Sequence, residues 1–554
     1  MAGLVVLAAF TACAQPPAPA AKPAATQAPT AAAAKPAADA KPTAAAAKPE
    51  AAKPEAAKPA AAKPAASGGA DNSRLVVVYN NTVNSVDPVN ADFAQSNLVE
   101  QAFYDTLVAY DADNKIVGRL AASFKLASDA TAVEITLRSG VKFHDGTPLT
   151  AKDVAYSLDR YTKLGKGVAQ FIRGYAATTV TDDTHLTIKL DRPNSLFLGG
   201  LSKIYILNST LLAKEGGTDD GQGWLSNHDA GSGPFTLTSI EQNGNITVSR
   251  FEDYWEYDAG RPKTLIYRLI KETATQRDEL KAGNVDVTSS LGPLDIKQLE
   301  GANGVKILKN KDRSIEYVAF NMVSGETTNP AVRKAIQLAY DYNGAMAKIY
   351  GGDAEIANGP LPTTMACHPD LPKSGQDVEL AKKTLADAGL KDLKLTMNFQ
   401  TAFEYQKQEA TLLQSNLKDI GITLDLTPLA FPDWLARLSD KAQIPQMFLL
   451  GDFAQFPDPG VMLVPYYMST SIGSNRTGYA NPEVDALLTK ALGTGDAAEQ
   501  CKLYEQAQTL IDKDAPILSM YTRFSSYGYR QNVSGFHIAY AGNGPWIPDL
   551  RVAP

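Results

Sequence analysis

The most informative stretch of this chain reads Leu137-Arg-Ser-Gly-Val-Lys-Phe-His-Asp-Gly-Thr-Pro-Leu-Thr-Ala-Lys-Asp-Val-Ala-Tyr-Ser-Leu158. Apolar and polar residues alternate over 133–138, where the stretch begins, which is typical of a half-buried strand. Asp145-Gly146 is a tight-turn dipeptide. Because Thr150 and Asp153 have the spacing of a capping box, the sequence predicts a helix that begins directly after Thr150.

Strand-like and helix-like patterns alternate through the rest of the chain. Patterns that predict strands occur at 75–79, 184–190, 393–399, 422–426 and 446–450, and 231–235 opens a further strand pair that 246–248 continues. Apolar residues at helical spacing occur at 97–107, 332–340, 377–389 and 481–491, the last two with capping residues in front. The alternation predicts an α/β protein. Residues 71–554 are too many for one hydrophobic core, so two or three lobes are expected.

The first thirteen residues are typical of a secretion signal. An apolar run is followed by two small residues and then by Cys13, as in the lipobox of a bacterial lipoprotein. No Lys or Arg precedes the run and Phe10 stands where lipoboxes prefer Leu, so the true start is expected upstream. We predict lipidation at Cys13, and an apolar N-terminus with an incidental cysteine is the alternative. The run is too short to span a bilayer, which needs ~20 apolar residues.

Residues 14–70 consist almost entirely of Ala, Pro and Lys. Proline blocks helix interiors, and a segment with so little to bury cannot offset its ordering entropy. The composition predicts a disordered tether with polyproline II character. A lysine-rich tail that binds DNA is the alternative, but acidic residues interrupt the lysines and no aromatic residue is present for base stacking.

The net charge of the chain and the spacing of its cysteines and histidines argue against several classes of function. The chain has a formal net charge of −7 at pH 7, and the body is more acidic still because lysine outnumbers acid in 14–70. An acidic body argues against nucleic-acid binding. The 3 cysteines and 5 histidines show no metal-motif spacing, so neither metal nor cofactor is expected. Cys367 and Cys501 either pair in an oxidising compartment or remain two buried thiols.

The stretch at 137–158 also closely resembles the signature of the extracellular solute-binding proteins of family 5. These are the receptors of ABC importers for oligopeptides, dipeptides and nickel. Further blocks are similar to the family in the same order, namely Gly231-Ser-Gly-Pro-Phe235, Tyr254-Trp255, 329–341, 381–389, 481–488 and 515–521. The resemblance covers essentially all of 75–540.

The resemblance implies a two-lobed α/β fold of the periplasmic-binding-protein type (type II), with an extra subdomain inserted in lobe I. The core of lobe I would comprise 71–104, 223–313 and 522–554, and the inserted subdomain would be 105–222. Lobe II would be 314–521. Two chain crossings would form a hinge, and solute would be enclosed between the lobes.

The same resemblance implies a function without catalysis. The protein would capture a peptide or oligosaccharide-like solute outside the membrane and deliver it to an ABC transporter permease. We expect a monomer on the periplasmic or cell-surface side of the membrane, anchored by lipid. A secreted hydrolase is one alternative, although the chain has no Gly-x-Ser-x-Gly elbow and no catalytic cysteine context. A module that presents its ligand to a membrane sensor is the other.

Most of the family motifs are interpreted as structural. His144 lies in the turn between the predicted strand and the capped helix, away from the expected cleft, so catalysis there is not expected. Tyr254-Trp255 is interpreted as packing rather than as a stacking surface for solute.

The main ligand wall is expected in lobe II. In peptide-binding members of the family, the segment after the strand at 446–450 reads tryptophan-x-x-aspartate, and the aspartate pairs with the peptide's amino group. Here Asp452 takes the tryptophan place and Gln455 the aspartate place. Dipeptide receptors also fix the ligand carboxylate with an arginine soon after the strand at 393–399, and 400–405 contains none. Both anchors of a short-peptide site are therefore expected to be absent.

The remaining candidates form an aromatic and amide-rich set. Such a set suits sugar rings, or a longer peptide held through its backbone. The predicted ligand-binding residues in this set are Tyr405, Phe431, Trp434, Asp452, Phe453, Gln455, Phe456, Asn475, Arg476 and Trp546, and Asp92 and Asn97 are expected to face the cleft from lobe I. For each aromatic residue, packing in the core is the alternative.

Overall fold

The computed structural model describes residues 73–83, 85–91, 94–241, 243–439, 444–471, 474–540 and 544–553. These residues belong to one compact unit, Gly68–Pro554. The predicted signal (1–13), the predicted tether (14–70), Cys13 and Asp92 lie outside the described residues. We use lobe I for 73–313 with 522–553 and lobe II for 314–521, and these predicted boundaries stay a prediction.

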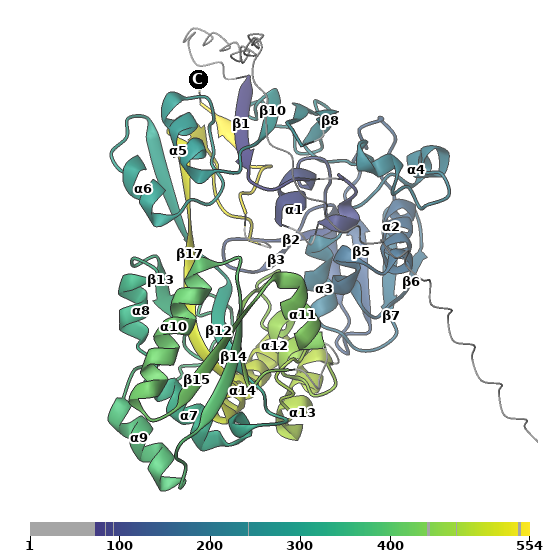
Figure 1. Ribbon diagram of the computed structural model, residues 1–554. Coiled ribbons are helices and arrows are strands. Elements are labelled where there is room, and N and C mark those ends of the chain that lie inside the picture. Colours follow the sequence, from purple (N-terminus) through teal and green to yellow (C-terminus); the bar gives the residue numbers. More distant parts are fainter. Residues whose placement is uncertain are drawn as a thin grey trace, which may run out of the picture. The chain divides into compact units, whose positions relative to one another are not determined.

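A four-stranded sheet forms part of lobe I, with the strand order β1-β10-β9-β8 (Figure 1). β1 (Arg74–Tyr79) pairs in parallel with β10 (Thr264–Leu269). The partners β9 (Ile246–Arg250) and β8 (Phe235–Ile240) are antiparallel. Every residue of β1 after its first is buried, as the apolar run predicts. The helices α5 (Thr273–Ala282) and α6 (Pro293–Leu299) follow in the chain.

The stretch quoted first folds as predicted. β5 (Ala132–Leu137) leads through a turn, with Gly146 at φ 84°, into α2 (Ala151–Leu164). The backbone N–H of Thr150 donates to the Asp153 carboxylate at 2.8 Å, so the capping box is formed. The antiparallel sheet around β5 has the order β4-β5-β7-β6 and is completed by β4 (Ala121–Leu126), β6 (Tyr175–Val180) and β7 (His185–Leu190).

A seven-stranded mixed sheet with a hydrophobic core on each face lies mostly in lobe II, and its strand β11 and the second part of β17 lie on the lobe I side of the predicted boundary. Its path runs β11-β17-β12-β16-β14-β15, with β13 paired to β17. The strands are β11 (Val305–Lys311), β12 (Ser314–Phe320), β13 (Ala354–Ile356), β14 (Lys394–Gln400), β15 (Thr423–Leu429), β16 (Met447–Phe453) and β17 (Ile517–Arg530). The helices are α7 (Pro330–Ala339), α8 (Tyr342–Lys348), α9 (Val378–Asp387), α10 (Glu404–Asp419), α11 (Phe431–Ser439), α12 (Gly460–Tyr467), α13 (Pro482–Leu492) and α14 (Ala497–Asp514).

The predicted caps of the lobe II helices are present. Asp377 accepts a hydrogen bond from the N–H of Leu380 at the start of α9. Asn481 accepts from Glu483 and Val484 in front of α13. The described residues contain further short elements: β2 (Val108–Tyr110), β3 (Ile116–Gly118), α3 (Leu196–Gly200), α4 (Ser209–Glu215), β18 (Val533–Ser534) and β19 (Arg551–Val552).

β17 connects the two lobes through its backbone (Figure 1). Its first part pairs with β12 of lobe II, and its second part, from Phe524 to Arg530, pairs with β11. A single bridge residue, Val287, lies between Tyr529 of β17 and Val77 of β1. β17 therefore runs continuously from the sheet of lobe II to the edge of the sheet of lobe I, and the short link between β11 and β12 makes a second crossing.

The predicted helix at 97–107 is only partly correct. The helix α1 is Ala94–Glu100, and the chain turns directly after it. The reason is that the backbone carbonyls of Ala102 and Phe103 accept hydrogen bonds from Phe235 and Gly233. A Cβ at Gly233 would lie 2.5 Å from the Phe103 carbonyl carbon, so glycine is needed for this close approach.

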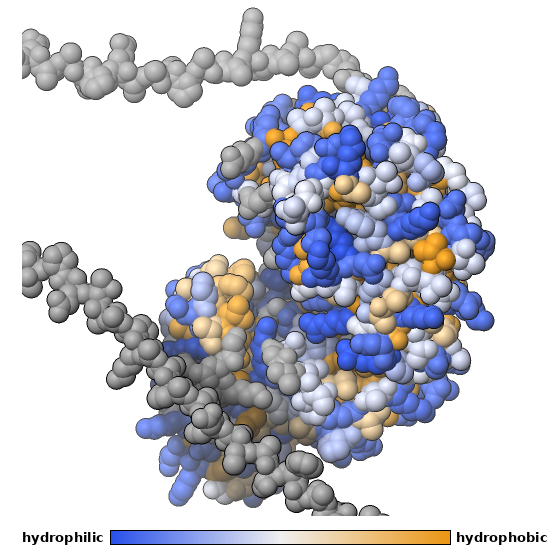
Figure 2. All heavy atoms as spheres, turned by 90° about the vertical axis from the view of Figure 1, so that its right-hand side faces the viewer, coloured by the Kyte–Doolittle hydropathy of each residue, from blue (hydrophilic) through white to orange (hydrophobic). Residues whose placement is uncertain are grey.

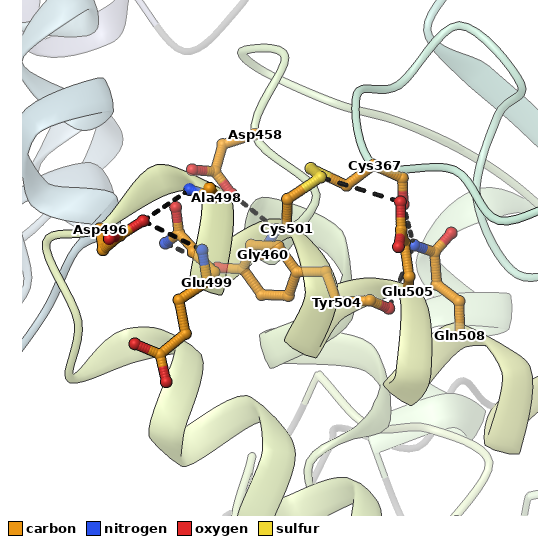
Figure 3. The surroundings of a disulfide bond; sticks show 11 residues. Cys367, Asp458, Gly460, Asp496, Ala498, Glu499, Cys501, Tyr504, Glu505 and Gln508 are labelled. Atoms are coloured by element: carbon orange, nitrogen blue, oxygen red, sulfur yellow. Dashed lines mark hydrogen bonds between the residues drawn. A yellow bond between two sulfur atoms is a disulfide. The ribbon is translucent and has the colours of Figure 1, made fainter.

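Cys367 and Cys501 form a disulfide, which settles the alternative that the sequence leaves open. The bond ties the loop that follows β13 to α14, across a sequence separation of 134 residues (Figure 3). The side-chain amide of Gln508, also on α14, donates to the Cys367 carbonyl at 2.7 Å. The loop is therefore fixed to α14 by a covalent bond and a hydrogen bond.

Candidate functional site

A cavity of about 220 Å³ in lobe I brings together residues that are far apart in the sequence. Asn97 and Trp546, both predicted to contact solute, line this cavity. Its walls also include Tyr110, Arg119, Tyr205, Glu256, His537 and Tyr540. The hydroxyl of Tyr205 donates to the Asn97 side chain at 3.0 Å, which fixes the amide.

Arg119 places a positive charge in the wall of this cavity. Its guanidinium is 2.9 Å from Asp105 and 3.3 Å from Glu256, and it donates to the hydroxyl of Tyr254 at 2.8 Å. Burial opposes the charge, but Tyr254 and the two carboxylates outweigh burial and raise the Arg119 pKa. Trp255 donates to Asp105 at 3.1 Å, so Tyr254 and Trp255 serve the packing of this network, as interpreted from the sequence.

The cavity is connected to lobe II by aromatic packing. The ring of Tyr110 stacks on Phe456 with the centroids 6.1 Å apart, and Phe171 meets Phe456 edge-on at the same distance. Phe456 is buried, and a Cβ at Gly199 would lie 3.1 Å from its ring. Phe456 therefore packs the two lobes together, which is the alternative that the sequence analysis gives for each aromatic candidate.

Asp452 is held at the end of β16 by two tyrosine hydroxyls. Tyr317 donates to its carboxylate at 2.5 Å and Tyr466 at 3.2 Å. The side chain is half-buried, so a charged or hydrogen-bonding group of a solute can reach it. Next to Asp452, Phe453 is exposed, and Gln455 in the following loop is half-buried.

The start of α11 presents an apolar surface. Phe431 is 53% exposed, and its ring stacks on the buried Trp434 at 6.1 Å. The Arg476 guanidinium lies over the Trp434 ring at 5.9 Å. In the surface view the molecule is deeply hollowed, and an apolar patch borders the hollow (Figure 2). Of these three predicted residues, Phe431 is therefore the one most open to a solute.

Asn475 has a structural role. Its side-chain amide donates to the carbonyls of Met468 and Tyr479, at 3.1 and 2.8 Å. These bonds brace the loop between α12 and α13. The amide N–H groups are used within the loop, and the predicted contact of Asn475 with solute stays a prediction.

Sequence reasoning missed an arginine that lies two residues beyond the predicted end of lobe II and contacts the lobe II wall from β17. Arg523 of β17 places its guanidinium 5.0 Å above the ring of Tyr405, and its Nη2 is 3.0 Å from Oε1 of Glu316. Residues 400–405 contain no arginine, but the fold places Arg523 over Tyr405, and the expected absence of a carboxylate anchor stays a prediction. Because β17 and the start of α10 are more than a hundred residues apart, no local pattern signals this contact.

Two buried glutamates lie behind Arg523. Glu316 of β12 and Glu409 of α10 are both fully buried, and the hydroxyl of Tyr350 donates to Glu409. Burial raises the Glu316 pKa to about 7, against the opposing effect of Arg523, and Asp452 adds to the rise. Burial and the neighbouring Glu316 also raise the Glu409 pKa well above its usual value. One arginine therefore faces two buried carboxylates, and the pKa of each is raised.

His144 is part of the scaffold, as interpreted from the sequence. Its Nδ1 pairs with Asp229 and its Nε2 contacts the carbonyl of Gly233 at 3.0 Å. Burial opposes protonation, but Asp229 outweighs it and raises the His144 pKa. The described residues contain no group of three metal-ligating side chains, and none of the described helices is long and apolar enough to cross a membrane.

Two α/β lobes joined by β17, with polar and aromatic walls on both, define a two-lobed solute-binding protein. The chain belongs to the bacterial extracellular solute-binding proteins, family 5, whose middle region matches residues 115–474. This membership confirms the family suggested by the 137–158 stretch.

Relatives of known name share most of the length of the chain. The probable D,D-dipeptide-binding periplasmic protein DdpA of Escherichia coli (strain K12) is 28% identical over 447 residues, which is 78% of this chain and 85% of DdpA. The glutathione-binding protein GsiB of Pectobacterium atrosepticum is 26% identical over 476 residues, with 84% and 91% covered. The fold matches the periplasmic binding protein DppA from Helicobacter pylori, solved in complex with peptide STSA, at a TM-score of 0.71 and 22% identity, covering 87% of this chain and 98% of DppA.

The raised pKa values of Glu316 and Glu409 predict a stability that falls as the pH rises. Both groups bind a proton more tightly in the folded state, so their contribution is complete below about pH 4 and is lost as the pH rises through their raised pKa values, which for Glu316 is about 7. Glu409→Gln mimics the protonated side chain, and the variant should lose less stability than the wild type between pH 5 and 8. The difference in slope should approach ~1.4 kcal/mol per pH unit.

Urea denaturation at both pH values measures this effect. Glu379→Gln on the exposed surface of α9 is the control and should keep the wild-type slope. If Glu409→Gln also keeps the wild-type slope, Glu409 is not protonated in the native protein.

Proposed function

We propose that this protein is the extracytoplasmic receptor of an ABC importer and that its solute is a peptide. The peptide lies between the lobes, and the protein delivers it to the permease. The observation that carries the proposal is the polar and aromatic cavity of lobe I, whose wall residue Tyr110 stacks on Phe456 of lobe II. The relatives DdpA and GsiB are named for binding a D,D-dipeptide and glutathione. Their names favour a peptide as the solute over the oligosaccharide considered from the sequence.

The two lobes contribute different chemistry to peptide binding. The lobe I cavity offers the amide of Asn97 and the indole of Trp546, which suit a backbone amide and an apolar side chain. Lobe II offers the carboxylate of Asp452, which suits a peptide ammonium. A solute that contacts both lobes stabilises the arrangement in which they are close, because it has more contacts there. The crossings at β11–β12 and β17 are the hinge.

The membrane anchor is the second part of the proposal. Cys13 follows an apolar run and small residues, which is the pattern of a lipidated cysteine. Lipid at Cys13 and the Ala-Pro-Lys segment behind it would keep the receptor near its permease. We infer a monomer, since one chain supplies both walls of the site.

A peptide mixture tests the solute class. Purified protein is incubated with pooled peptides of two to five residues or with maltotriose and chitotriose, and binding is measured by native mass spectrometry and calorimetry. Peptides should bind and the sugars should not. Trp546→Ala should weaken peptide binding roughly tenfold, which is ~1.4 kcal/mol.

Tyr257→Ala is the matched control for Trp546→Ala. Tyr257 is an exposed aromatic residue of lobe I that does not line the cavity, so its removal should leave the affinity unchanged. Binding of a sugar together with no binding of any peptide would contradict the proposed solute class.

Substitution of the lipobox cysteine tests the anchor. Cys13→Ala removes the acceptor thiol, so the protein should move from the membrane fraction to the soluble extracytoplasmic fraction of cells that express the full chain. Cys501→Ser, which removes a cysteine of the disulfide, is the control and should leave the protein in the membrane fraction. Retention of the Cys13→Ala protein in membranes would show that another element anchors the chain.

A further inference from the structure

The pair of Arg523 and Glu316 is exposed on one side only. The Arg523 side chain is 40% exposed, whereas the Glu316 side chain is fully buried behind it. A solute that approaches lobe II therefore meets the guanidinium first and cannot reach the carboxylate directly. The exposed charge of this site is positive, so its ligand is an anion.

Each residue of the pair has one buried polar atom without a hydrogen-bond partner among the described residues. Among the described residues, no partner accepts from Nε of Arg523 and none donates to Oε2 of Glu316, although both atoms are buried. A buried polar atom without a partner costs free energy. A bound anion would accept hydrogen bonds on the exposed side of the guanidinium, because the planar group presents several N–H groups in one fork.

The backbone of β16 leaves room for this arrangement. Gly451 is exposed, and a Cβ there would lie 2.4 Å from Oε1 and 2.6 Å from Oε2 of Glu316. Since the φ of Gly451 is not positive, the glycine is needed for space rather than for conformation. The carboxylate of Glu316 therefore lies against the backbone of Gly451.

The charges around the pair come from several elements. Arg523 faces Glu316 of β12, Asp312 of the β11–β12 link, and the hydroxyls of Tyr350 and Tyr405. Glu316 faces Asp452 of β16 as well. Glu409 is the remaining carboxylate, and burial raises its pKa. Arg523 is the cation that opposes burial and favours the ionised form of Glu316.

We propose that Arg523 binds the terminal carboxylate of the peptide and that Glu316 takes up a proton from solvent when it does so. The proposal rests on the proposed function, since it names the end of the peptide that this wall of lobe II receives. The peptide carboxylate accepts N–H bonds from the guanidinium and draws it away from Glu316. A fully buried carboxylate that loses its cation is more stable when protonated. The one covalent bond that forms is the O–H bond of Glu316, and its proton comes from the buffer.

The test uses a pool of tetrapeptides with free carboxyl ends and the same pool with amidated carboxyl ends. The wild-type protein should bind the free acids roughly 10- to 100-fold more tightly than the amides, because a charge-assisted contact is lost in the amides. Calorimetry at pH 8 in buffers of different ionisation enthalpy should show uptake of close to one proton with the free acids. Uptake should fall at pH 6, where Glu316 already holds the proton in the free protein.

Variants separate the two residues. Arg523→Gln should lose the preference for the free acids. Glu316→Gln should keep that preference and lose the proton uptake. Arg268→Gln is the matched control, since Arg268 is 37% exposed and lies 3.0 Å from Glu279 in lobe I, and it should change neither quantity. Melting temperatures check that each variant is folded, and the proton uptake of the wild type tests the proposal without any substitution.

Each remaining outcome overturns a defined part of the account. Equal binding of acids and amides by the wild type, or no proton uptake at pH 8, overturns the inference while the peptide receptor stands. A preference that survives Arg523→Gln overturns the role of Arg523. Binding of neither pool overturns the proposed function and this inference with it.

Discussion

The continuous backbone pairing of β17 is the constraint on which the rest of this structure depends. The strand is 14 residues long, pairs with β12, β13 and β11 in turn, and reaches the sheet of lobe I through the bridge at Val287. Arg523 lies in the middle of this strand. Its position is therefore fixed by main-chain hydrogen bonds on both sides, and a side chain on such a strand is held more rigidly than one on a loop.

The charges of the lobe II wall follow from that placement. Burial of Glu316 and Glu409 would be costly if both were ionised, and one arginine cannot neutralise two carboxylates. Arg523 forms an ion pair with Glu316, and burial raises the pKa of Glu409. This balance leaves the exposed side of the wall positive at Arg523 and negative at Asp452, which is bound by two tyrosine hydroxyls. A peptide carries the complementary charges at its two ends.

Local sequence patterns predicted the local structure. The capping box at Thr150 and Asp153, the buried strand β1 and the caps at Asp377 and Asn481 are confirmed, because each depends on residues a few positions apart. The helix at 97–107 was predicted too long, because the backbone there bonds to residues about 130 positions later. The pairing of Cys367 with Cys501 and of Arg523 with Glu316 could not be predicted, since only the fold brings these residues together. Of the candidate site residues, Asn97 and Trp546 meet in one cavity, whereas Phe456 and Asn475 serve packing and loop bracing.

The identity of the solute that the protein carries from its cell tests the central claim most directly. The protein is purified from its native host without denaturant, and the solute released by acid is identified by mass spectrometry. The account predicts a peptide with a free carboxyl end. Release of a sugar, or of a peptide whose carboxyl end is blocked, would contradict it.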